Sequence, residues 1–349
     1  MSRDSLNESL YDWPDLGWDE QQGHDPRPSL LLGNGFSQNI WPGFKYDSLF
    51  SKASQNSPFK LLTDTDQALF TIFGTENFEM ILNVLAASKA VSVALNQDDN
   101  CELLQDHENR IRKALIQAVH SVHIFPASKF PEENRTGIAN ELAKYMSIYY
   151  TNYDLLIYWC MIMHIKECHE NHFFDFFWDN PFNSNNVGII NKENRSGVYF
   201  LHGSLHLYRN ILGRTYKQVS MGTGLLESFG DNHDTGAVPL FISEGTHRYK
   251  LQSIYQSDYL SFVFSCFEKD SNPLVILGHS LGGSDKHIAN AINGHEHRDV
   301  AISVRKNGNI PKKKAAIRHA LPNVENLYFF DAATHPLLHE SLRIEEAPQ

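Results

Sequence analysis

Short apolar runs alternate with longer amphipathic stretches along the chain. The short runs are bounded by glycine or polar residues, a pattern typical of buried strands. They lie at residues 30–32, 146–150, 198–201, 238–242, 273–277, 300–304 and 327–330. Apolar residues recur at helical spacing in 76–95, 110–122, 155–165 and 247–267. Strands separated by helices predict an α/β protein with a Rossmann-like, mostly parallel sheet and helices on both faces.

The order of these elements predicts one domain with an insertion. Residues 1–28, rich in Asp, Trp, Pro and Gly, predict an extended N-terminal lead-in. Residues 29–349 form the Rossmann-like domain, with a helical insertion at about 59–125 after the first strand. Residues 41–58 indicate an irregular loop that folds over a ligand, and residues 205–236 indicate glycine-rich loops with a hairpin.

Composition narrows the class of protein. Hydrophobic residues make up 42% of the 349 residues, enough for a sizeable core. Lys and Arg total 30 against 41 Asp and Glu, so the net charge of −11 disfavours nucleic acid and anionic membranes as general ligands. The most apolar tract, 155–165, is far shorter than the ~20 residues that span a bilayer. The four cysteines form no C-x-x-C pair, and with no signal sequence they predict a cytoplasmic protein.

Four predicted strands end in polar or glycine-rich motifs. These are Gly-Asn-Gly-Phe-Ser at 33–37, Thr-Asn-Tyr-Asp at 151–154, His-Gly-Ser at 202–204, and Gly-His-Ser-Leu-Gly-Gly-Ser-Asp at 278–285. Parallel α/β sheets bind ligands at the carboxyl ends of their strands. The first motif favours a phosphate-binding loop, although Gln38 replaces the third glycine of the dinucleotide fingerprint, which disfavours a dehydrogenase.

In this order, over about residues 30–288, the four motifs resemble those of sirtuin-like NAD-consuming proteins. The similarity is greatest to the zinc-free branch of bacterial antiphage defence. It implies an NAD glycohydrolase that cleaves the nicotinamide–ribose bond to give nicotinamide and ADP-ribose, depleting NAD in antiviral defence. It also implies a homo-oligomer and a partner ATPase. Deacetylating sirtuins carry a zinc ribbon with two C-x-x-C pairs, and because these are absent we expect no zinc and no deacylation.

The resemblance also implies roles for individual residues. Asn152 binds a ribose hydroxyl or the attacking water, and His202 is the base, since its unperturbed pKa lies near neutrality. Gly33, Asn34, Gly35 and Ser37 take the pyrophosphate. Asp154 orients Asn152 or binds a ribose hydroxyl. The adenosine half is contacted by the loop that contains Gly278, Ser280 and Asp285.

Two other functions remain open. The same loops suit a non-catalytic module that senses NAD or ADP-ribose without turnover. Alternatively, Ser280 is the nucleophile of an α/β-hydrolase-type esterase, because residues 278–282 match G-x-S-x-G after a strand. Its acid and base would then come from the downstream residues Asp299, Asp331, His335 and His339.

Two further patterns favour ordinary structural roles. Cys160, His164, Cys168 and His172 recur every four residues and predict a packed helix face, because a helix rise of ~1.5 Å per residue spreads them too far for one ion. We therefore expect no metal site. Residues 312–314 are three consecutive lysines, which predict a solvated basic face or a contact for a partner or for nucleic acid.

Overall fold

The structure is a computed structural model. It describes residues 9–18, 27–44, 49–54, 62–124, 127–168, 172–177, 181–186, 195–218, 238–242 and 246–345. Predictions for 1–8, 19–26, 45–48, 55–61, 125 and 219–237 lie outside the described residues.

A seven-stranded parallel sheet forms the centre of the molecule, in the order β10-β9-β8-β1-β2-β4-β3. Its strands are β1 (Ser29–Leu32), β2 (Ser147–Tyr150), β3 (Phe173–Phe174), β4 (Ser196–Phe200), β8 (Leu274–Leu277), β9 (Asp299–Val304) and β10 (Asn326–Asp331). Every residue of β1, β2, β4 and β8 is buried, as expected for strands covered on both faces. The predicted Rossmann-like α/β fold is confirmed.

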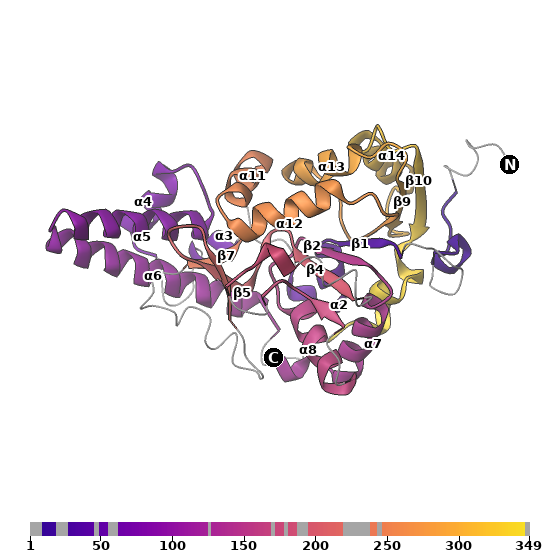
Figure 1. Cartoon of the computed structure of the whole chain (residues 1–349), viewed down its shortest axis with the longest axis horizontal. Coiled ribbons are helices and arrows are strands. Elements are labelled where there is room, and N and C mark those ends of the chain that lie inside the picture. Colours follow the sequence, from indigo (N-terminus) through magenta and orange to yellow (C-terminus); the bar gives the residue numbers. More distant parts are fainter. Residues whose placement is uncertain are drawn as a thin grey trace.

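Helices cover both faces of this sheet (Figure 1). One face carries α11 (His247–Tyr255), α12 (Asp258–Lys269), α13 (Lys286–Asn293) and α14 (Ile310–Ala320). The other carries α2 (Asn34–Ile40), α7 (Glu132–Leu142) and α8 (Leu156–Cys168). Within the described ranges, no helix is long and apolar enough to cross a membrane.

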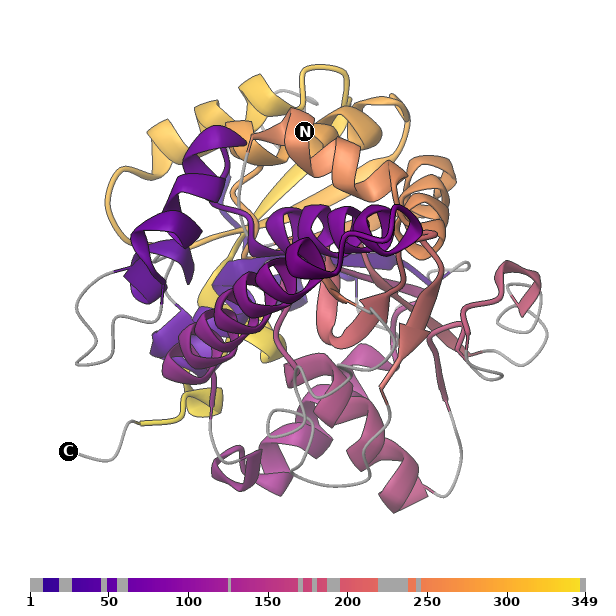
Figure 2. The ribbon, with the colours of Figure 1, turned by 90° about the vertical axis from the view of Figure 1, so that its left-hand side faces the viewer.

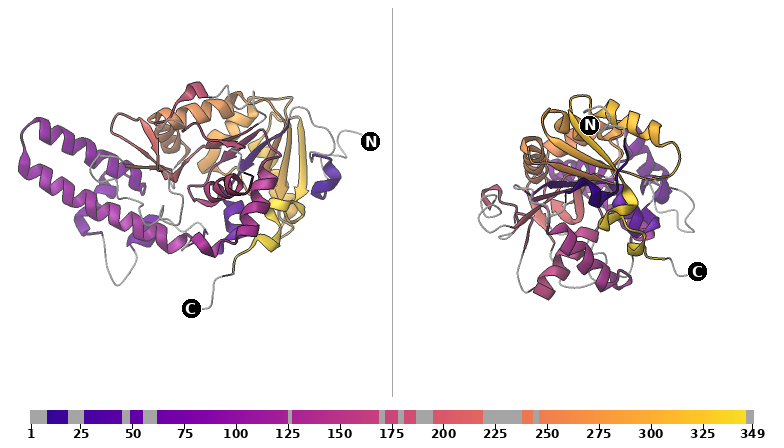
Figure 3. Two further views of the ribbon diagram at one scale, coloured as in Figure 1. Left: turned by 60° about the horizontal axis from the view of Figure 1, so that its bottom comes forward. Right: turned by 90° about the vertical axis from the view of Figure 1, so that its right-hand side faces the viewer.

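The predicted helical insertion is present between β1 and β2. It contains α3 (Leu49–Ser54), α4 (Asp64–Ile72), α5 (Phe78–Ala94) and α6 (Asp98–Val122). The α5–α6 pair projects from the body as a long hairpin (Figure 1 and Figure 3), and Figure 2 looks at its free end. The apolar stripes that predicted these helices, including Ile81 and Leu82 of α5 and Ile111 and Leu115 of α6, are buried.

One predicted strand belongs to a different sheet. β7 (Val238–Phe241) pairs antiparallel with β5 (Gly203–Arg209), which pairs antiparallel with β6 (Thr215–Lys217), in a separate three-stranded sheet. The chain enters it through Gly203, whose φ of 73° and 2.1 Å from a built Cβ to the Leu240 carbonyl oxygen require glycine. The expected hairpin is therefore β5–β6, and 238–242 was wrongly placed in the parallel sheet.

Three other predictions need correction. The single helix expected at 247–267 is two helices, because Ser257 is extended and its hydroxyl accepts a hydrogen bond from Leu260 N, starting α12 anew. The lead-in is packed rather than merely extended, since Trp13 and Trp18 are buried and Tyr11 forms a β-bridge to Phe330 of β10. The irregular loop expected at 41–58 includes the helix α3.

Candidate functional site

The structure brings the four motif segments to the carboxyl edge of the parallel sheet. The loops after β1, β8 and β9, together with Thr151 after β2, surround a cavity of about 510 Å³. Five predicted binding residues line it: Asn34, Gly35, Gly278, Ser280 and Asp285. The predicted residues outside its lining are Gly33, Ser37, Asn152, Asp154 and His202. The predicted residues thus form an outer layer around the cavity and an inner layer behind it.

The glycines allow the β1 and β8 loops to cross closely. Gly35 N donates to Gly278 O at 2.8 Å, and Gly33 N donates to Leu277 O at 2.9 Å. A Cβ on Gly35 would lie 2.8 Å from Gly278 Cα, and Gly278 itself has a φ of 63°. We expected these N–H groups to face a pyrophosphate, but those of Gly33 and Gly35 are already bonded to protein carbonyls. A phosphate here would therefore be bound by donors other than these two N–H groups.

A buried hydrogen-bonded cluster joins α2 to the segment after β2. Asn152 Nδ2 donates to Ser37 Oγ at 2.6 Å, and the Ser37 hydroxyl donates to Asp154 Oδ2 at 2.6 Å. Tyr150 donates to the other Asp154 oxygen at 2.6 Å, and Leu156 N bonds that oxygen at 3.0 Å. Burial raises the pKa of Asp154. Asp154 therefore binds the first N–H of α8 and fixes Ser37, which in turn orients the Asn152 amide, one of the two roles predicted for Asp154.

The amide of Asn152 keeps one end open. Its nitrogen is held by Ser37, while its carbonyl oxygen has no hydrogen-bond partner in the described part of the chain. The side chain is 7% exposed. The next residue toward β2, Thr151, lines the cavity. An oriented acceptor at this position suits a hydroxyl group or a water molecule.

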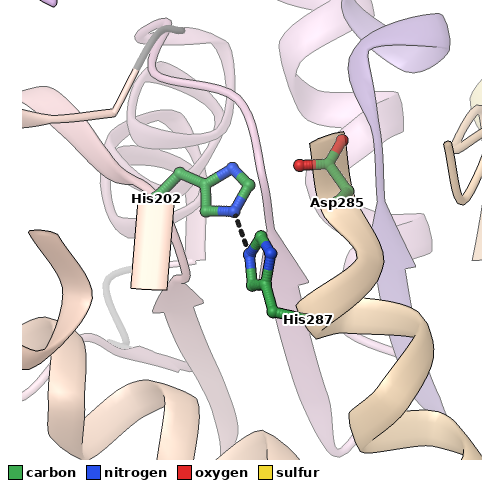
Figure 4. A group of neighbouring side chains, drawn as sticks. All are labelled: His202, Asp285 and His287. Carbon is green, nitrogen blue, oxygen red and sulfur yellow. Dashed lines mark hydrogen bonds between the residues drawn. The ribbon is translucent and has the colours of Figure 1, made fainter. Parts of the chain in front are cut away.

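His202 is paired with a second histidine, His287 of α13. Figure 4 shows the two rings facing each other, with Nε2 atoms 2.9 Å apart and the Asp285 carboxylate nearby. His202 Nδ1 lies 3.1 Å from the Thr151 carbonyl oxygen, which only accepts, so Nδ1 carries the proton in the neutral ring. His202 Nε2 then accepts from His287 Nε2–H. This assignment leaves His287 Nδ1 unprotonated, with an open lone pair, and this buried atom has no hydrogen-bond partner among the described residues.

The electrostatics keep both rings neutral near neutral pH. Burial and the nearby Lys250 charge lower the pKa of His202 well below its ordinary value. Burial lowers the pKa of His287 to about 4, although Asp285 opposes the shift. Lys250 Nζ donates to Asp285 Oδ1 at 2.7 Å. Burial would raise the pKa of Asp285, but His202, Lys250 and His279 outweigh it and hold that pKa below its usual range.

Sequence reasoning missed three of these residues. His287 follows Asp285 by two positions at the start of α13, so an Asp-x-His signal was present in the sequence. Tyr150 precedes the Thr-Asn-Tyr-Asp motif directly. Lys250 lies in α11, far from any motif, and only the fold places it against Asp285.

His202, Asp285 and His287 are also the described residues that could hold a metal ion, with donor atoms within 4.8 Å of one another. We had expected no such group. A metal-bound imidazole ordinarily donates its other N–H to a carbonyl or carboxylate. His202 meets this requirement through Thr151, but His287 Nδ1 does not, and Lys250 already neutralises Asp285. The arrangement fits a proton-sharing histidine pair better than a metal site.

The match to a known family covers the residues of this site except Leu338. A family model described as a domain of unknown function (DUF4917) matches residues 30–337. The chain belongs to this family. The matched region contains all four motif segments and the helical insertion. No curated protein matches the chain.

The esterase triad is not assembled in this DUF4917 chain. Ser280 is exposed and bonds no histidine or carboxylate within the described ranges. Of its predicted partners, Asp331 pairs with Lys306 at 2.9 Å, and His335 Nε2 lies 3.0 Å from the Tyr145 hydroxyl. His339 is bonded to Ser341, and Asp299 begins β9, at the opposite edge of the sheet.

The Cys/His series at 160–172 and the lysine run at 312–314 have only in part the structural roles that we predict for them. Cys160 is fully buried in α8, and burial raises its thiol pKa, but α8 ends at Cys168, so His172 does not share its face as we predicted. The basic run at 312–314 lies on α14. One of its lysines, Lys313, lines the cavity and so belongs to the site rather than to a purely solvated face.

Proposed function

We propose that the chain is an NAD glycohydrolase of the sirtuin-like, zinc-free kind that its motifs resemble. The observation that supports this most is the inner layer behind the cavity. There the oriented Asn152 amide follows Thr151 in the chain, and the neutral His202 is bonded to the Thr151 carbonyl oxygen, so both adjoin a residue that lines the cavity. Hydrolysis of a glycosidic bond to a good leaving group needs two functions: a group that holds the sugar in place and a base for the attacking water.

Asn152 supplies the first function. Its nitrogen is fixed through Ser37 and Asp154, so its open carbonyl oxygen presents a pre-oriented acceptor to a ribose hydroxyl or to water. The nicotinamide–ribose bond breaks, nicotinamide leaves with the bonding electron pair, and the oxygen of water forms the new bond to the ribose carbon.

His202 supplies the second function with the help of His287. Water must lose a proton as it attacks, and the open lone pair of the histidine pair is His287 Nδ1. A proton taken up there lets His287 Nε2–H pass to His202 Nε2. The resulting imidazolium donates through Nδ1 to Thr151 O, a hydrogen bond already present.

A second function is favoured by one specific observation. Neither His202 nor His287 lines the cavity, and the Nε2 atom of His202 is occupied by His287. A module that binds NAD or ADP-ribose without turnover would have this geometry. The glycohydrolase requires water to reach the pair, whereas the sensing module does not.

From the same resemblance we infer the biological setting. The chain would act in the cytoplasm as a homo-oligomer, with a partner ATPase, and would deplete NAD during antiviral defence. The net charge of −11 supports a small nucleotide rather than a nucleic acid as the general ligand.

The deciding experiment incubates the purified full chain with NAD and follows nicotinamide and ADP-ribose by chromatography. We expect time-dependent release of both from the wild-type protein, and release about 10²–10⁴-fold slower from His202→Ala. Binding of NAD without release, measured also with candidate partners present, would reject the glycohydrolase and favour the sensing module.

A further inference from the structure

The residues that line the cavity differ in chemistry across the sheet. Thr151 follows β2 and is bonded to His202, and an Asp285 carboxylate oxygen lies within 4.8 Å of a His202 ring nitrogen. On the β9 side, separated from β2 by β8 and β1, the lining residues from β9 and α14 include the apolar Val304 and Ile317 and the cations Arg305 and Lys313. An apolar wall beside two cations suits an aromatic base that carries an anionic group.

The charges of these two cations are not neutralised by the protein. Arg305 Nη2 donates to Gly35 O at 3.0 Å, and Lys313 Nζ donates to Arg305 O at 3.1 Å and to Asn307. All of these acceptors are uncharged. By contrast, Lys306, beside Arg305, is paired with Asp331 at 2.9 Å. Within the described ranges, neither Arg305 nor Lys313 has a carboxylate partner.

Among the described lining residues, no carboxylate lies on the β9 side of the cavity. Asp285, which the resemblance assigns to the adenosine half, is the acidic residue in the lining, and it is ion-paired with Lys250 rather than open to a ribose hydroxyl. Dinucleotide-binding folds that take an unphosphorylated ribose use a carboxylate for its 2′-hydroxyl, and those that take a 2′-phosphate place an arginine there. The planar guanidinium matches phosphate oxygens in geometry as well as in charge.

We propose that the adenosine end of the ligand carries a phosphate on its ribose, and that Arg305 and Lys313 bind this group. The preferred dinucleotide is then the 2′-phosphorylated form of NAD. This inference rests on the proposed function for the identity of the ligand, and it adds the class of substrate. It does not depend on turnover.

The test measures binding to the full chain by titration calorimetry, with ADP-ribose 2′-phosphate and ADP-ribose as the two probes. Neither probe has a nicotinamide group to lose. We expect the 2′-phosphorylated probe to bind about 10- to 100-fold more tightly, the range for hydrogen bonds to a charged group. Arg305→Gln and Lys313→Gln should each reduce this preference, whereas Arg305→Lys should keep part of it.

Lys312→Gln is the matched control, since Lys312 lies on the same helix outside the cavity lining. It should leave the preference unchanged. Equal affinity of the wild-type protein for both probes would overturn the inference. So would an equal loss for both probes in Arg305→Gln, which would assign the cations to the diphosphate, and so would binding of neither probe.

The same measurements separate this inference from the glycohydrolase. A preference for the 2′-phosphorylated probe, without nicotinamide release from either dinucleotide, would support the inference and reject the enzyme. Nicotinamide release without that preference would reject the inference and support the enzyme.

Discussion

Two buried polar clusters in this protein contain similar residues but are satisfied to different degrees. One lies in the helical insertion around Asp66, and the other lies behind the cavity around His202. Both combine a carboxylate, histidine and a basic side chain. They differ in how many of their polar atoms have partners.

The Asp66 cluster is saturated. Each carboxylate oxygen accepts at least two hydrogen bonds, from Thr63, His107 and Arg110, at 2.6 to 3.2 Å. Burial alone would raise the pKa of Asp66, but the bonds from Arg110, Thr63 and His107 outweigh it and lower the pKa to about 2. Thr63 and Asp66 also form a capping box that starts α4. This cluster stabilises the link between α4 and α6.

The His202 cluster is incomplete. His287 Nδ1 is buried and has no hydrogen-bond partner in the part of the chain that the structure describes. The hydrogen bond of the Asn152 side chain there is made by its nitrogen, so its carbonyl oxygen is open as well. Leaving a buried polar group unpaired costs about 1–3 kcal/mol, so such atoms are few in native proteins. The comparison teaches that saturation indicates a structural role, and that open atoms beside a cavity indicate a place for a ligand.

The strongest test of the comparison removes the functional groups themselves. His202→Ala should lower nicotinamide release about 10²–10⁴-fold, the usual contribution of a positioned acid–base group. Asn152→Ala should also lower it, because the ribose or the attacking water is no longer held in place. His297→Ala, which removes an 84% exposed histidine, is the control and should keep wild-type activity. Wild-type turnover by a folded His202→Ala protein would contradict the assignment of His202.

His287 comes next in expected effect. His287→Ala should lower the maximal rate about 10- to 100-fold, with little change in KM, because it removes a proton-transfer step rather than a ligand contact. His287→Gln can still donate to His202 but cannot relay a proton. Recovery in His287→Gln would show that His287 only positions His202. A stoichiometric bound metal, lost in His287→Ala, would reject the proton-sharing pair.

Asp66→Asn should affect stability and not chemistry. We expect it to lose about 1–3 kcal/mol of unfolding free energy, because a saturated buried acceptor is removed, while turnover per folded molecule is unchanged. Since the folded-state pKa of Asp66 is lowered, its contribution is fully present above pH ~4 and disappears as the pH falls toward 2.

Urea unfolding of both proteins at pH 7 and near pH 2 measures this contribution. The wild-type advantage should shrink at the lower pH. Asp99→Asn, an exposed carboxylate in α6, is the matched control and should cost little. A large loss of turnover in folded Asp66→Asn would contradict the structural role of this cluster.

Ser280→Ala should have a smaller effect. An exposed loop hydroxyl that touches the ligand contributes about 0.5–1.5 kcal/mol, so KM should rise by roughly tenfold or less while the maximal rate is kept. Ser284→Ala, in the same loop, is the control. Covalent labelling of Ser280 by a fluorophosphonate, with ester turnover that Ser280→Ala abolishes, would restore the esterase.

The smallest expected effect is the change of the reaction rate with pH between pH 6 and 7.5. Because the pKa values of His202 and His287 are lowered, the neutral base persists below pH 6.5, and activity is lost only at more acidic pH. The rate at pH 6 should stay within about twofold of that at pH 7.5. A base of ordinary pKa would lose roughly three quarters of its active form at pH 6, and such a loss would show that the cluster is open to solvent.

Local sequence patterns determined much of the secondary structure of this protein and the position of its candidate site. The apolar runs predicted all the strands of the parallel sheet except the two-residue β3. Polar residues after those strands indicated the carboxyl edge of the sheet as the site. These inferences succeed because burial on both faces, capping and turn chemistry act over a few neighbouring residues.

Tertiary structure alone decided how the site is connected. The pairing of His202 with His287, the contact of Lys250 with Asp285, and the entry of Arg305 and Lys313 into one cavity join residues from distant parts of the chain. The assignment of 238–242 to a second sheet also depended on where β5 leaves Gly203. The period of apolar residues indicates which face of a helix or strand is buried. Which side chains then contact each other depends on which elements the fold brings together, and no local sequence pattern encodes contacts between residues far apart in the chain.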